Sequence, residues 1–506
     1  MTHKIYEYVS KLNGEPVCLK TLSLVISTIL FTMRKNMLFA GSLLCCLPFS
    51  LLAQTFTPNV SQYIKDSARE TVITDVTLFD GTGGPSRPHQ TIVIQDGMIS
   101  QVENAGEFRV PKDAEVINGT GKTVIPGLVM LHEHLYYTLP IDNYFNVAEM
   151  PSSFPRMYLA GGVTTMRTAG SIEPQTDLAL RRMIREGKLI GPDMDVTAPY
   201  IERPGFDIPA INIIKDTAEA ATSVNFWADK GCTSFKMYMH ITRGDLRNVV
   251  REAHKRGLKV TGHLCSVTYR EAAEIGIDDL EHGFMASSDF DSAKKEDAFD
   301  YAEAHQALQN LDINSPKMKS LILFLISKKV ALTSTLPVFE PVTNREVIQG
   351  GGGDAVLQQV KDMVTSRWKM RQFKDSAAMD LFNRELVWEK QFYDAGGLLV
   401  AGTDPTGGGR TIAGYANYRE IELLVEGGFT VAQAIKICTL NGALYLNREK
   451  EIGTVSPGKK ADLVLINGEI GKDIKNIRNT EIVFKNGIGF DSPKIFASVK
   501  GKVGIN

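Results

Sequence analysis

The chain has 506 residues, and its composition and charge already narrow the kind of protein it can be. Hydrophobic residues make up 43% and charged residues 23%, which is ordinary for a globular protein. Lys and Arg together number 56 against 58 for Asp and Glu, and no basic stripe or acidic tail stands out. This balance argues against nucleic acid or anionic lipid as a partner, so a small-molecule partner is expected. The length predicts one large domain with a smaller one.

The N-terminus predicts a secretory signal. Arg34 and Lys35 precede an apolar run, 37–52, which is followed by Ala53 at a plausible cleavage point. Residues 1–53 are therefore interpreted as an upstream extension and a signal peptide, and the mature protein is expected to be exported, either periplasmic or secreted. The apolar stretches are shorter than the roughly 20 residues that span a bilayer, so no stable membrane insertion is expected after cleavage. A retained anchor is the alternative.

Both ends of the mature chain predict short β-strands. Residues 70–125 and 448–506 contain alternating apolar runs that end in Asp-Gly or Asn-Gly, a pattern typical of hairpins. Each set is too small to be stable alone, so the two sets are expected to pair. We predict one small composite β-sandwich built from both ends, with the region 126–447 inserted into it.

The inserted region alternates short apolar, β-branched runs with segments of helical period, which predicts an α/β fold with a parallel sheet. Eight such units favour a (β/α)8, TIM-like barrel, and a doubly wound open sheet lacks its usual Gly-rich phosphate turn. The segment Ala355–Ala395 is expected to be a helical lid or excursion, and specificity is expected to reside in this segment and in the loops that lead from strands to helices. The expected strands are Val124–His134, Gly162–Arg167, Met194–Ala198, Thr233–Tyr238, Lys259–Leu264, Asp279–His282, Val330–Leu336 and Leu398–Asp404, with helices at Asp245–Arg256, Tyr269–Glu274 and Ala432–Tyr445.

Four of the nine histidines fall at the ends of expected strands. His132 and His134 are two residues apart, so a strand places both imidazoles on one side. His263 and His282 close two later strands, and Asp404 closes the last. In a barrel these ends meet at one face, where imidazoles and a carboxylate would bind a metal ion and move a proton.

Lys236 lies within an apolar strand, where burial of an ammonium group is costly. A neutral buried lysine can react with carbon dioxide to form a carbamate whose two oxygens could bridge two divalent ions. A lysine that extends its ammonium group outward to solvent is the equally weighted alternative. Tyr238, two residues later and on the same side, is a candidate to steady a substrate carbonyl, although packing in the core is the more ordinary role of a tyrosine.

These motifs resemble the amidohydrolase superfamily, and within it the imidazolonepropionase-like and prolidase-like metal hydrolases. The resemblance spans 72–487 in the order of the family's motifs. The segments that carry it include Ile125–Val129 before His132-x-His134, Gly162–Arg167, Phe235–Tyr238, Gly262-His263, Glu281–Gly283, Gly402–Asp404, Arg419–Leu423, Ala434–Ala443 and Gly453–Val464.

The resemblance implies a barrel inserted into a composite β-sandwich and a binuclear metal centre. His132, His134 and Asp404 would bind one ion, His263 and His282 the second, and carboxylated Lys236 would bridge them. From the ligand types, Zn²⁺ is the expected ion, and Mn²⁺, Co²⁺ or Fe²⁺ would also fit. Two positions depart from the family pattern. Met130 and Thr168 stand where an Asp is common, which puts in question the groups that support the ligands.

The predicted function is an exported, binuclear amidohydrolase that cleaves an amide or peptide-like C–N bond, as a dipeptidase or N-acyl-amino-acid hydrolase. The alternatives are a mononuclear cyclic-amide hydrolase or deaminase, a lactonase or phosphotriesterase-like esterase, and a non-catalytic exported binding protein on the same scaffold. The substrate is expected to be a small amide or dipeptide-like molecule. Assembly as a homo-oligomer is left open.

Overall fold

The computed structural model describes residues 55–139, 146–205, 211–343, 345, 348, 350–370 and 376–504. The predicted extension and signal peptide, 1–53, lie outside these residues. No helix within the described residues is both long enough and apolar enough to cross a membrane. The location of the protein therefore stays a prediction.

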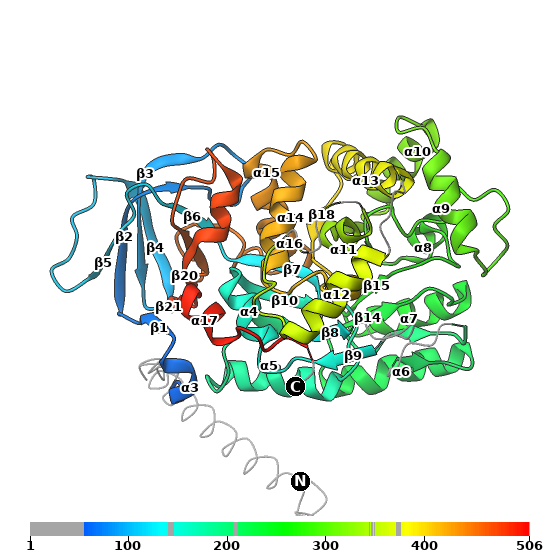
Figure 1. The fold of residues 1–506 in the computed structure, drawn as a ribbon, viewed down its shortest axis with the longest axis horizontal. Helices are drawn as coiled ribbons and strands as arrows, with labels where there is room; N and C mark the ends of the chain where they lie inside the picture. Colours follow the sequence, from blue (N-terminus) through cyan, green and yellow to red (C-terminus); the bar gives the residue numbers. More distant parts are fainter. Residues whose placement is uncertain are drawn as a thin grey trace, which may run out of the picture. The chain divides into compact units, whose positions relative to one another are not determined.

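Both ends of the described chain meet in one sheet (Figure 1). The pairing places Leu463 opposite Pro126 and Ile466 opposite Thr123, so an N-terminal strand and a C-terminal strand are antiparallel neighbours. The predicted pairing of the two ends is thus observed. Within the described residues the hydrogen bonds give one continuous nine-stranded sheet in the order β1-β21-β20-β19-β6-β2-β3-β4, with β5 beside β2, and the sandwich stays a prediction. The strands are β1 (Ile64–Asp66), β2 (Glu70–Leu78), β3 (Arg87–Gln95), β4 (Met98–Asn104), β5 (Glu115–Asn118), β6 (Thr123–Pro126), β19 (Leu463–Ile466), β20 (Thr480–Lys485) and β21 (Ile488–Asp491).

This sheet has its own apolar cluster, which includes Ile73, Ile92, Val124, Leu463 and Phe484. Side chains from both ends of the chain contribute to it. Because neither end can bury its apolar face without the other, the pairing follows from the hydrophobic effect.

The inserted region is built on parallel strands, as predicted, and their order in the sheets follows the chain except at β12 and β13. The described residues form a three-stranded sheet, β11-β10-β7, and a seven-stranded sheet, β13-β12-β14-β15-β16-β17-β18. The strands are β7 (Leu128–Glu133), β10 (Val163–Thr168), β11 (Asp193–Asp195), β12 (Ile201–Glu202), β13 (Asn212–Ile213), β14 (Ser234–Met237), β15 (Lys259–Gly262), β16 (Asp279–Glu281), β17 (Ala331–Ser334) and β18 (Leu399–Ala401).

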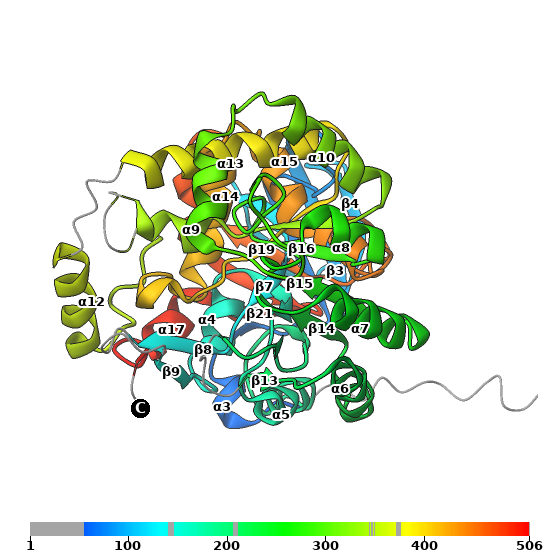
Figure 2. The same cartoon turned by 90° about the vertical axis from the view of Figure 1, so that its right-hand side faces the viewer.

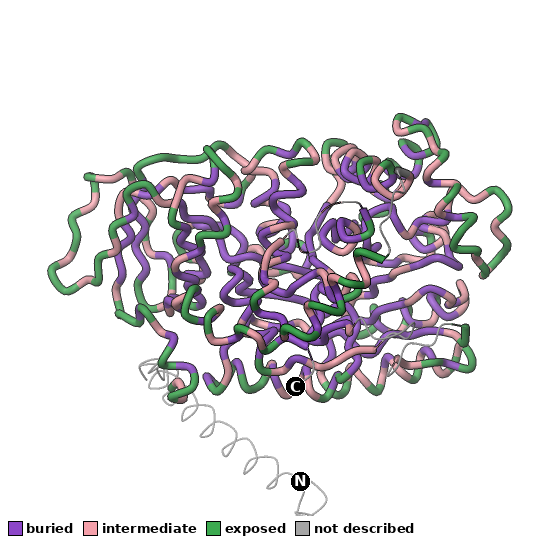
Figure 3. The backbone as a smooth tube through the Cα atoms, in the orientation of Figure 1, coloured by how far each residue is buried: buried purple, intermediate pink, exposed green. Residues whose placement is uncertain are grey.

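Hydrogen bonds link the two parallel sheets on both sides. An isolated parallel bridge joins Thr197 to Ser234, and the N–H groups of Thr403 and Asp404 both donate to His132 O at 3.0 Å. The result is a TIM-barrel-like α/β arrangement, although strand pairing alone divides it into two sheets. Figure 2 shows α6, α7, α8 and α13 arranged around these strands, and Figure 3 shows that the central strands are buried.

In the chain, most of the helices come between the strands of the inserted region. The helices are α3 (Pro58–Ser61), α4 (Phe154–Ala160), α5 (Pro174–Arg185), α6 (Thr217–Lys230), α7 (Arg243–Lys255), α8 (Tyr269–Ile275), α9 (Tyr301–Asn310), α10 (Pro316–Ser327), α11 (Leu336–Phe339), α12 (Gln358–Met370), α13 (Ser376–Asp394), α14 (Tyr415–Glu426), α15 (Val431–Lys436), α16 (Gly442–Tyr445) and α17 (Ser492–Ser498). Shorter helical turns are η2 (Glu340–Val342), η3 (Gly407–Gly409), η4 (Ile437–Asn441) and η5 (Ile474–Asn479), and a separate hairpin pairs β8 (Tyr136–Leu139) with β9 (Asn146–Glu149).

Two predicted elements differ in detail from the structure. The predicted strand Val124–His134 divides at Gly127 into β6 and β7, which belong to different sheets. At this point a Cβ on Gly127 would lie 2.2 Å from Thr164 Oγ1, so glycine permits the close approach where the chain changes sheet. The predicted helix Ala432–Tyr445 is interrupted by the π-helical turn η4, in which the Asn441 amide donates to Leu399 O at 2.7 Å.

Candidate metal centre

The six predicted ligands lie in or directly after strands of the parallel sheets, toward the carboxyl ends, as expected for a barrel-like fold. Most of their side chains are almost fully removed from solvent. They are His132 in β7, His134 after β7, Lys236 in β14, His263 after β15, His282 after β16 and Asp404 after β18.

His132, His134 and Asp404 form one group. Each offers a ligand atom, and these atoms all lie within 4.8 Å of one another. His134 Nε2 is 3.2 Å from Asp404 Oδ1, and His132 Nε2 is 3.9 Å from Asp404 Oδ2. The structure therefore brings together the three residues predicted to share one ion.

The remaining two histidines lie beside this group. The ring of His282 is 4.6 Å from that of His132 and 4.4 Å from that of His263, measured between centroids. His132 and His282 also form a second potential metal-binding group with Glu281. Glu281 was not predicted as a ligand. Glu281 stands next to His282 in the sequence, but a glutamate at the end of a strand does not by itself indicate a metal ligand.

Lys236 is 1% exposed, and its Nζ atom contacts Glu281 Oε2. Burial lowers the pKa of the Lys236 ammonium well below its usual value; Asp404 opposes this shift and Arg167 adds to it. A lysine that loses its proton readily is the form that can react with carbon dioxide. The carboxylation itself remains a proposal.

The donor set fits a divalent metal ion. Burial lowers the pKa of His132 well below its usual value and that of His282 to about 3, so both imidazoles are neutral at pH 7. Burial raises the pKa of Asp404, but its hydrogen bond with His134 and the nearby charges bring the pKa below its usual value. His132 Nδ1 is buried without a hydrogen-bond partner. Neutral imidazoles, an ionised carboxylate and an unsatisfied ring nitrogen are what a metal site supplies.

Two of these ligands adopt unusual backbone conformations. His282 has φ of 71° and Asp404 has φ of 42°, both in the left-handed region that L-residues with a side chain rarely adopt. Such conformations cost free energy and cluster at functional sites, so they support the assignment of these two positions.

A network of buried hydrogen bonds joins the strands that precede several of the predicted ligands. The Arg167 guanidinium donates to Asp279 Oδ2 at 2.8 Å and to Glu281 Oε1 at 3.1 Å. Thr261 and Thr333 donate further hydrogen bonds to Asp279. This network fixes the strand that leads to His282.

A second set of contacts fixes β7. Glu133, between the two histidines, accepts hydrogen bonds from Thr403 Oγ1 at 2.5 Å and from Asn417 Nδ2 at 2.9 Å. Burial raises the pKa of Glu133 to about 8, against these hydrogen bonds, so it is largely protonated at neutral pH. It couples β7 to the segment that carries Asp404.

The two departures from the family pattern are accommodated within the core. Met130 is fully buried among apolar side chains. Thr168 Oγ1 accepts a hydrogen bond from the Thr197 N–H at 2.9 Å, which ties β10 to the next strand segment. Thr168 thus has a structural contact of its own.

Tyrosine side chains also lie beside the candidate metal centre. Tyr200 OH lies 3.3 Å from His134 Nε2 and 2.7 Å from Tyr136 OH. The predicted Tyr238 is half-buried, with its ring 5.2 Å from that of His263. Tyr238 is therefore beside the metal ligands, whereas Tyr136 and Tyr200 were not predicted because they lie in irregular segments or short hairpins without a motif.

A cavity of about 500 Å³ opens beside His263. Its walls come from the segment after β14, the segment after β16 and helix α9, and include Tyr238, His240, Met285, His305 and Phe339. Among the described residues that line it, none falls in the predicted lid Ala355–Ala395. The predicted strand-to-helix loops do line the cavity, and the contribution of the excursion to specificity stays a prediction.

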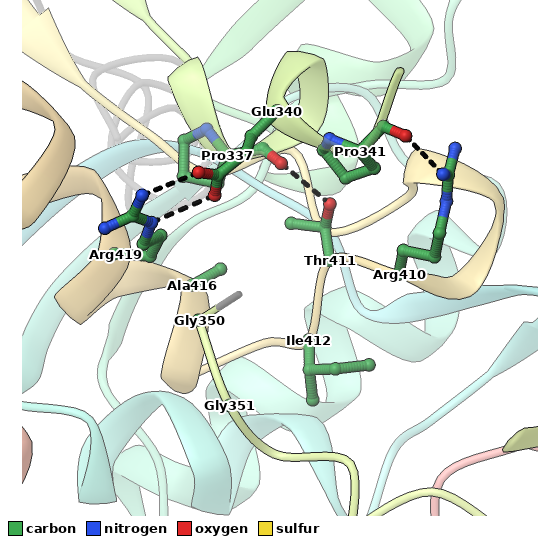
Figure 4. Close-up of a pocket in the computed structure, with 10 residues that line it drawn as sticks. All are labelled: Pro337, Glu340, Pro341, Gly350, Gly351, Arg410, Thr411, Ile412, Ala416 and Arg419. Carbon is green, nitrogen blue, oxygen red and sulfur yellow. Dashed lines mark hydrogen bonds and ion pairs between the residues drawn. The ribbon is translucent and has the colours of Figure 1, made fainter. Parts of the chain in front are cut away.

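A separate, water-sized hollow of about 10 Å³ lies at the end of α14 (Figure 4). The Arg419 guanidinium donates to both Glu340 oxygens, at 2.9 and 2.6 Å, and Thr411 Oγ1 donates to Pro337 O at 3.0 Å. These contacts hold η2, directly after Phe339, whose ring is 5.7 Å from that of His282. The hydrogen bonds around this hollow therefore help to position Phe339.

Comparison with known proteins agrees with this picture. The model of the amidohydrolase family matches residues 389–496. A 5-methylthioadenosine/S-adenosylhomocysteine deaminase of Moorella thermoacetica is 41% identical over 83 residues, 15% of this chain and 19% of that protein. The match thus spans about a fifth of that relative's length.

The structural likeness is much longer. A structure described as a prolidase of Bifidobacterium longum is 23% identical, with a TM-score of 0.60, over 85% of this chain and 99% of that one. A Xaa-Pro dipeptidase with bound methionine is 19% identical, with a TM-score of 0.62, over 83% and 100%. These structural matches confirm the expected fold, and the family model over residues 389–496 agrees with the predicted resemblance to the amidohydrolase superfamily.

Proposed function

We propose that the protein is a metal-dependent hydrolase that cleaves a C–N bond of an amide. The observation that carries the proposal is the convergence of His132, His134 and Asp404 within 4.8 Å, at the strand ends where such a centre was predicted. The names of the similar proteins, a deaminase, a prolidase and a dipeptidase, all refer to enzymes that act on C–N bonds. The proposal includes a closed eight-stranded barrel.

The proposed roles of the residues are as follows. His132, His134 and Asp404 would hold one ion; His263 and His282 would hold a second, with carboxylated Lys236 between them. When bound, a divalent ion such as Zn²⁺ lowers the pKa of water and polarises a carbonyl. Asp404 takes the proton from the attacking water and passes it to the departing amine, and Tyr238 steadies the carbonyl oxygen.

Metal analysis of the purified protein, followed by an amide panel, tests this function. We expect two divalent ions per chain, loss of hydrolysis on chelation and its return on addition of Zn²⁺. Full turnover after complete removal of metal would contradict the proposal. Lactones and phosphotriesters in the same panel separate it from the esterase alternative, and metal-binding without turnover of any substrate favours the binding-protein alternative.

A mononuclear centre is the second candidate. It is favoured by the grouping of the ligand atoms, because those of His132, His134 and Asp404 lie within 4.8 Å of one another, whereas among the described residues His263 belongs to neither such group. The variant Lys236→Met separates the two. A binuclear enzyme should lose one ion and about 10²-fold or more in kcat, at least the upper end of the loss that follows removal of a group that orients a metal ligand. A mononuclear enzyme should keep its metal content.

We further propose that the protein is exported after cleavage behind Ala53. Sequencing of the N-terminus of the protein recovered from cells and from the medium tests this. A mature chain that begins near Gln54 agrees with the proposal, and a cytoplasmic protein with an intact N-terminus contradicts it.

A further inference from the structure

The cavity beside His263 differs in chemistry from the metal centre that it adjoins. Apolar and sulfur-containing side chains make up much of its wall, including Met239, Cys265, Met285, Phe299 and Phe339. No Asp, Glu, Lys or Arg is among the described residues that line it. At about 500 Å³ it is large enough for an aromatic or branched group.

The polar groups near this wall are engaged elsewhere. Glu202 is fully buried and accepts hydrogen bonds from the N–H groups of Met239 at 3.0 Å and His240 at 2.8 Å, and it lies 3.2 Å from His240 Nδ1. Ser287 Oγ donates to Asp289 Oδ2 at 3.0 Å. Neither carboxylate is offered to a ligand in the cavity.

One face of α9 closes the cavity. Tyr301, Ala304 and His305 are spaced as neighbours on one side of a helix, and all three line the cavity. Burial lowers the pKa of the His305 imidazole, so this side chain is neutral at pH 7. The wall therefore provides hydrogen-bonding groups and aromatic surface without an Asp, Glu, Lys or Arg among the described residues that line it.

We infer that this cavity is the specificity pocket and takes a large, uncharged, apolar group attached to the scissile amide, so that the preferred substrate is an N-acylated or otherwise charge-blocked amide and not a free dipeptide. The inference rests on the proposed function and names its substrate class. A free dipeptide carries an ammonium and a carboxylate, and burial of either against this wall would leave it unpaired, which is costly. An apolar group gains from the same burial.

Three substrates with the same scissile bond test the inference. L-Phenylalanyl-L-proline is zwitterionic, 3-phenylpropanoyl-L-proline lacks its ammonium, and 3-phenylpropanoyl-pyrrolidine lacks both charges. We expect at least one charge-deleted substrate to exceed the dipeptide in kcat/KM by about tenfold or more, since an unpaired buried charge costs several times RT. A dipeptide hydrolysed as well as or better than both analogues overturns the inference while leaving the proposed hydrolase intact.

A binding measurement keeps the test independent of turnover. The metal-loaded protein is titrated with neutral 3-phenylpropanamide and with cationic phenylalaninamide, which differ by one ammonium group. The neutral amide should bind at least about tenfold more tightly. Equal or tighter binding of the cation overturns the inference even if no amide in the panel is hydrolysed.

Charge placed on the wall should change this preference. Ala304 is 8% exposed and lines the cavity, whereas Ala302, on the same helix, is exposed to solvent. Ala304→Glu should reduce binding of 3-phenylpropanamide by about tenfold or more and reduce or reverse its advantage over the cation. Ala302→Glu, with the same added charge, should change neither.

A second wall variant guards against misfolding of the first. Ala286→Asp places a carboxylate on the segment after β16, at a half-buried position of the same cavity. If either wall variant keeps the wild-type melting temperature and also keeps the wild-type preference for the neutral amide, the cavity is not the specificity pocket.

Discussion

Two sets of buried polar side chains in the parallel strands, here called the lower and the upper layer, differ in the hydrogen bonds of their central members, Asp279 and His132. In the lower layer, Asp279 accepts from Arg167, Thr261 and Thr333. In the upper layer, His132 Nδ1 is buried without a hydrogen-bond partner, 3.4 Å from Glu281 Oε2. Because a buried polar group without a partner is costly, an unsatisfied group at a strand end indicates a place for a ligand, whereas a satisfied network indicates stability.

This contrast predicts separable effects. Substitutions in the upper layer should reduce metal binding and turnover with little loss of stability. Substitutions in the lower layer should reduce the free energy of unfolding. The tests below begin with the largest expected effect.

Asp404→Asn should have the largest effect on catalysis. The amide keeps the size of the side chain but cannot take a proton, so kcat should fall by about 10³-fold, within the range for loss of a general base. The melting temperature should change little. The measurement is steady-state kinetics of the metal-loaded variant, with the exposed Asp394→Asn as a matched control. A kcat within tenfold of wild type would remove Asp404 from the catalytic step.

Arg167→Met should have the largest effect on stability. It removes the cation that pairs with Asp279 and Glu281 and leaves two buried carboxylates, at a cost of about 3–5 kcal/mol. Urea unfolding of the variant and of the exposed Arg182→Met control measures this. If the free energy of unfolding falls by less than about 1 kcal/mol, the lower layer does not have the stabilising role that its hydrogen bonds indicate.

Thr335→Val tests the boundary between the layers. Thr335 Oγ1 lies 2.8 Å from His282 Nδ1, and this hydrogen bond would orient the imidazole. The variant keeps the shape of the side chain, so metal affinity should fall by about 10–100-fold, as for other contacts that orient a metal ligand. Metal titration with a competing chelator measures the change, with Thr222→Val on the exposed face of α6 as the control. Unchanged affinity would show that His282 is oriented without Thr335, or is not a ligand.

The last prediction concerns the pH dependence of stability. Burial raises the pKa of Glu389, which accepts from Ser334 Oγ at 2.7 Å, from 4.5 to about 8. A carboxyl with a raised pKa in the folded state contributes stability that is complete below its unfolded pKa and is lost as pH rises through its folded pKa. The free energy of unfolding of wild type should therefore decline between about pH 4.5 and 8 relative to Glu389→Gln. A pH-independent difference between the two proteins would contradict this.

Much of the fold was accessible from the sequence because its signals are local. The predicted strands are present in chain order, and the pairing of the two ends followed from sets of hairpins that could not be stable alone. The division at Gly127 was not predictable, because the apolar run is continuous and only the close approach to Thr164 separates the two strands. The sequence also left open whether the strand-to-helix loops or the excursion line the cavity, since helical period alone does not show which segment turns over the site.

The residues of the candidate site were likewise predictable only where their signals are local in the sequence. His132, His134 and Asp404 were identified because their spacing and strand-end positions are sequence properties, and the structure brings them together. Glu281, Tyr136 and Tyr200 were missed, because a residue type at an ordinary position acquires a role only from its neighbours in space.

The sequence by itself therefore determined the periodicity, the strand order and the residue types of the metal centre. Tertiary structure alone decided which groups are satisfied and which are left without a hydrogen-bond partner, and it placed a largely apolar cavity beside His263. The physical reason is that backbone periodicity is set by residues close in the chain, whereas burial, desolvation and hydrogen-bond satisfaction depend on side chains that only the folded chain brings into contact.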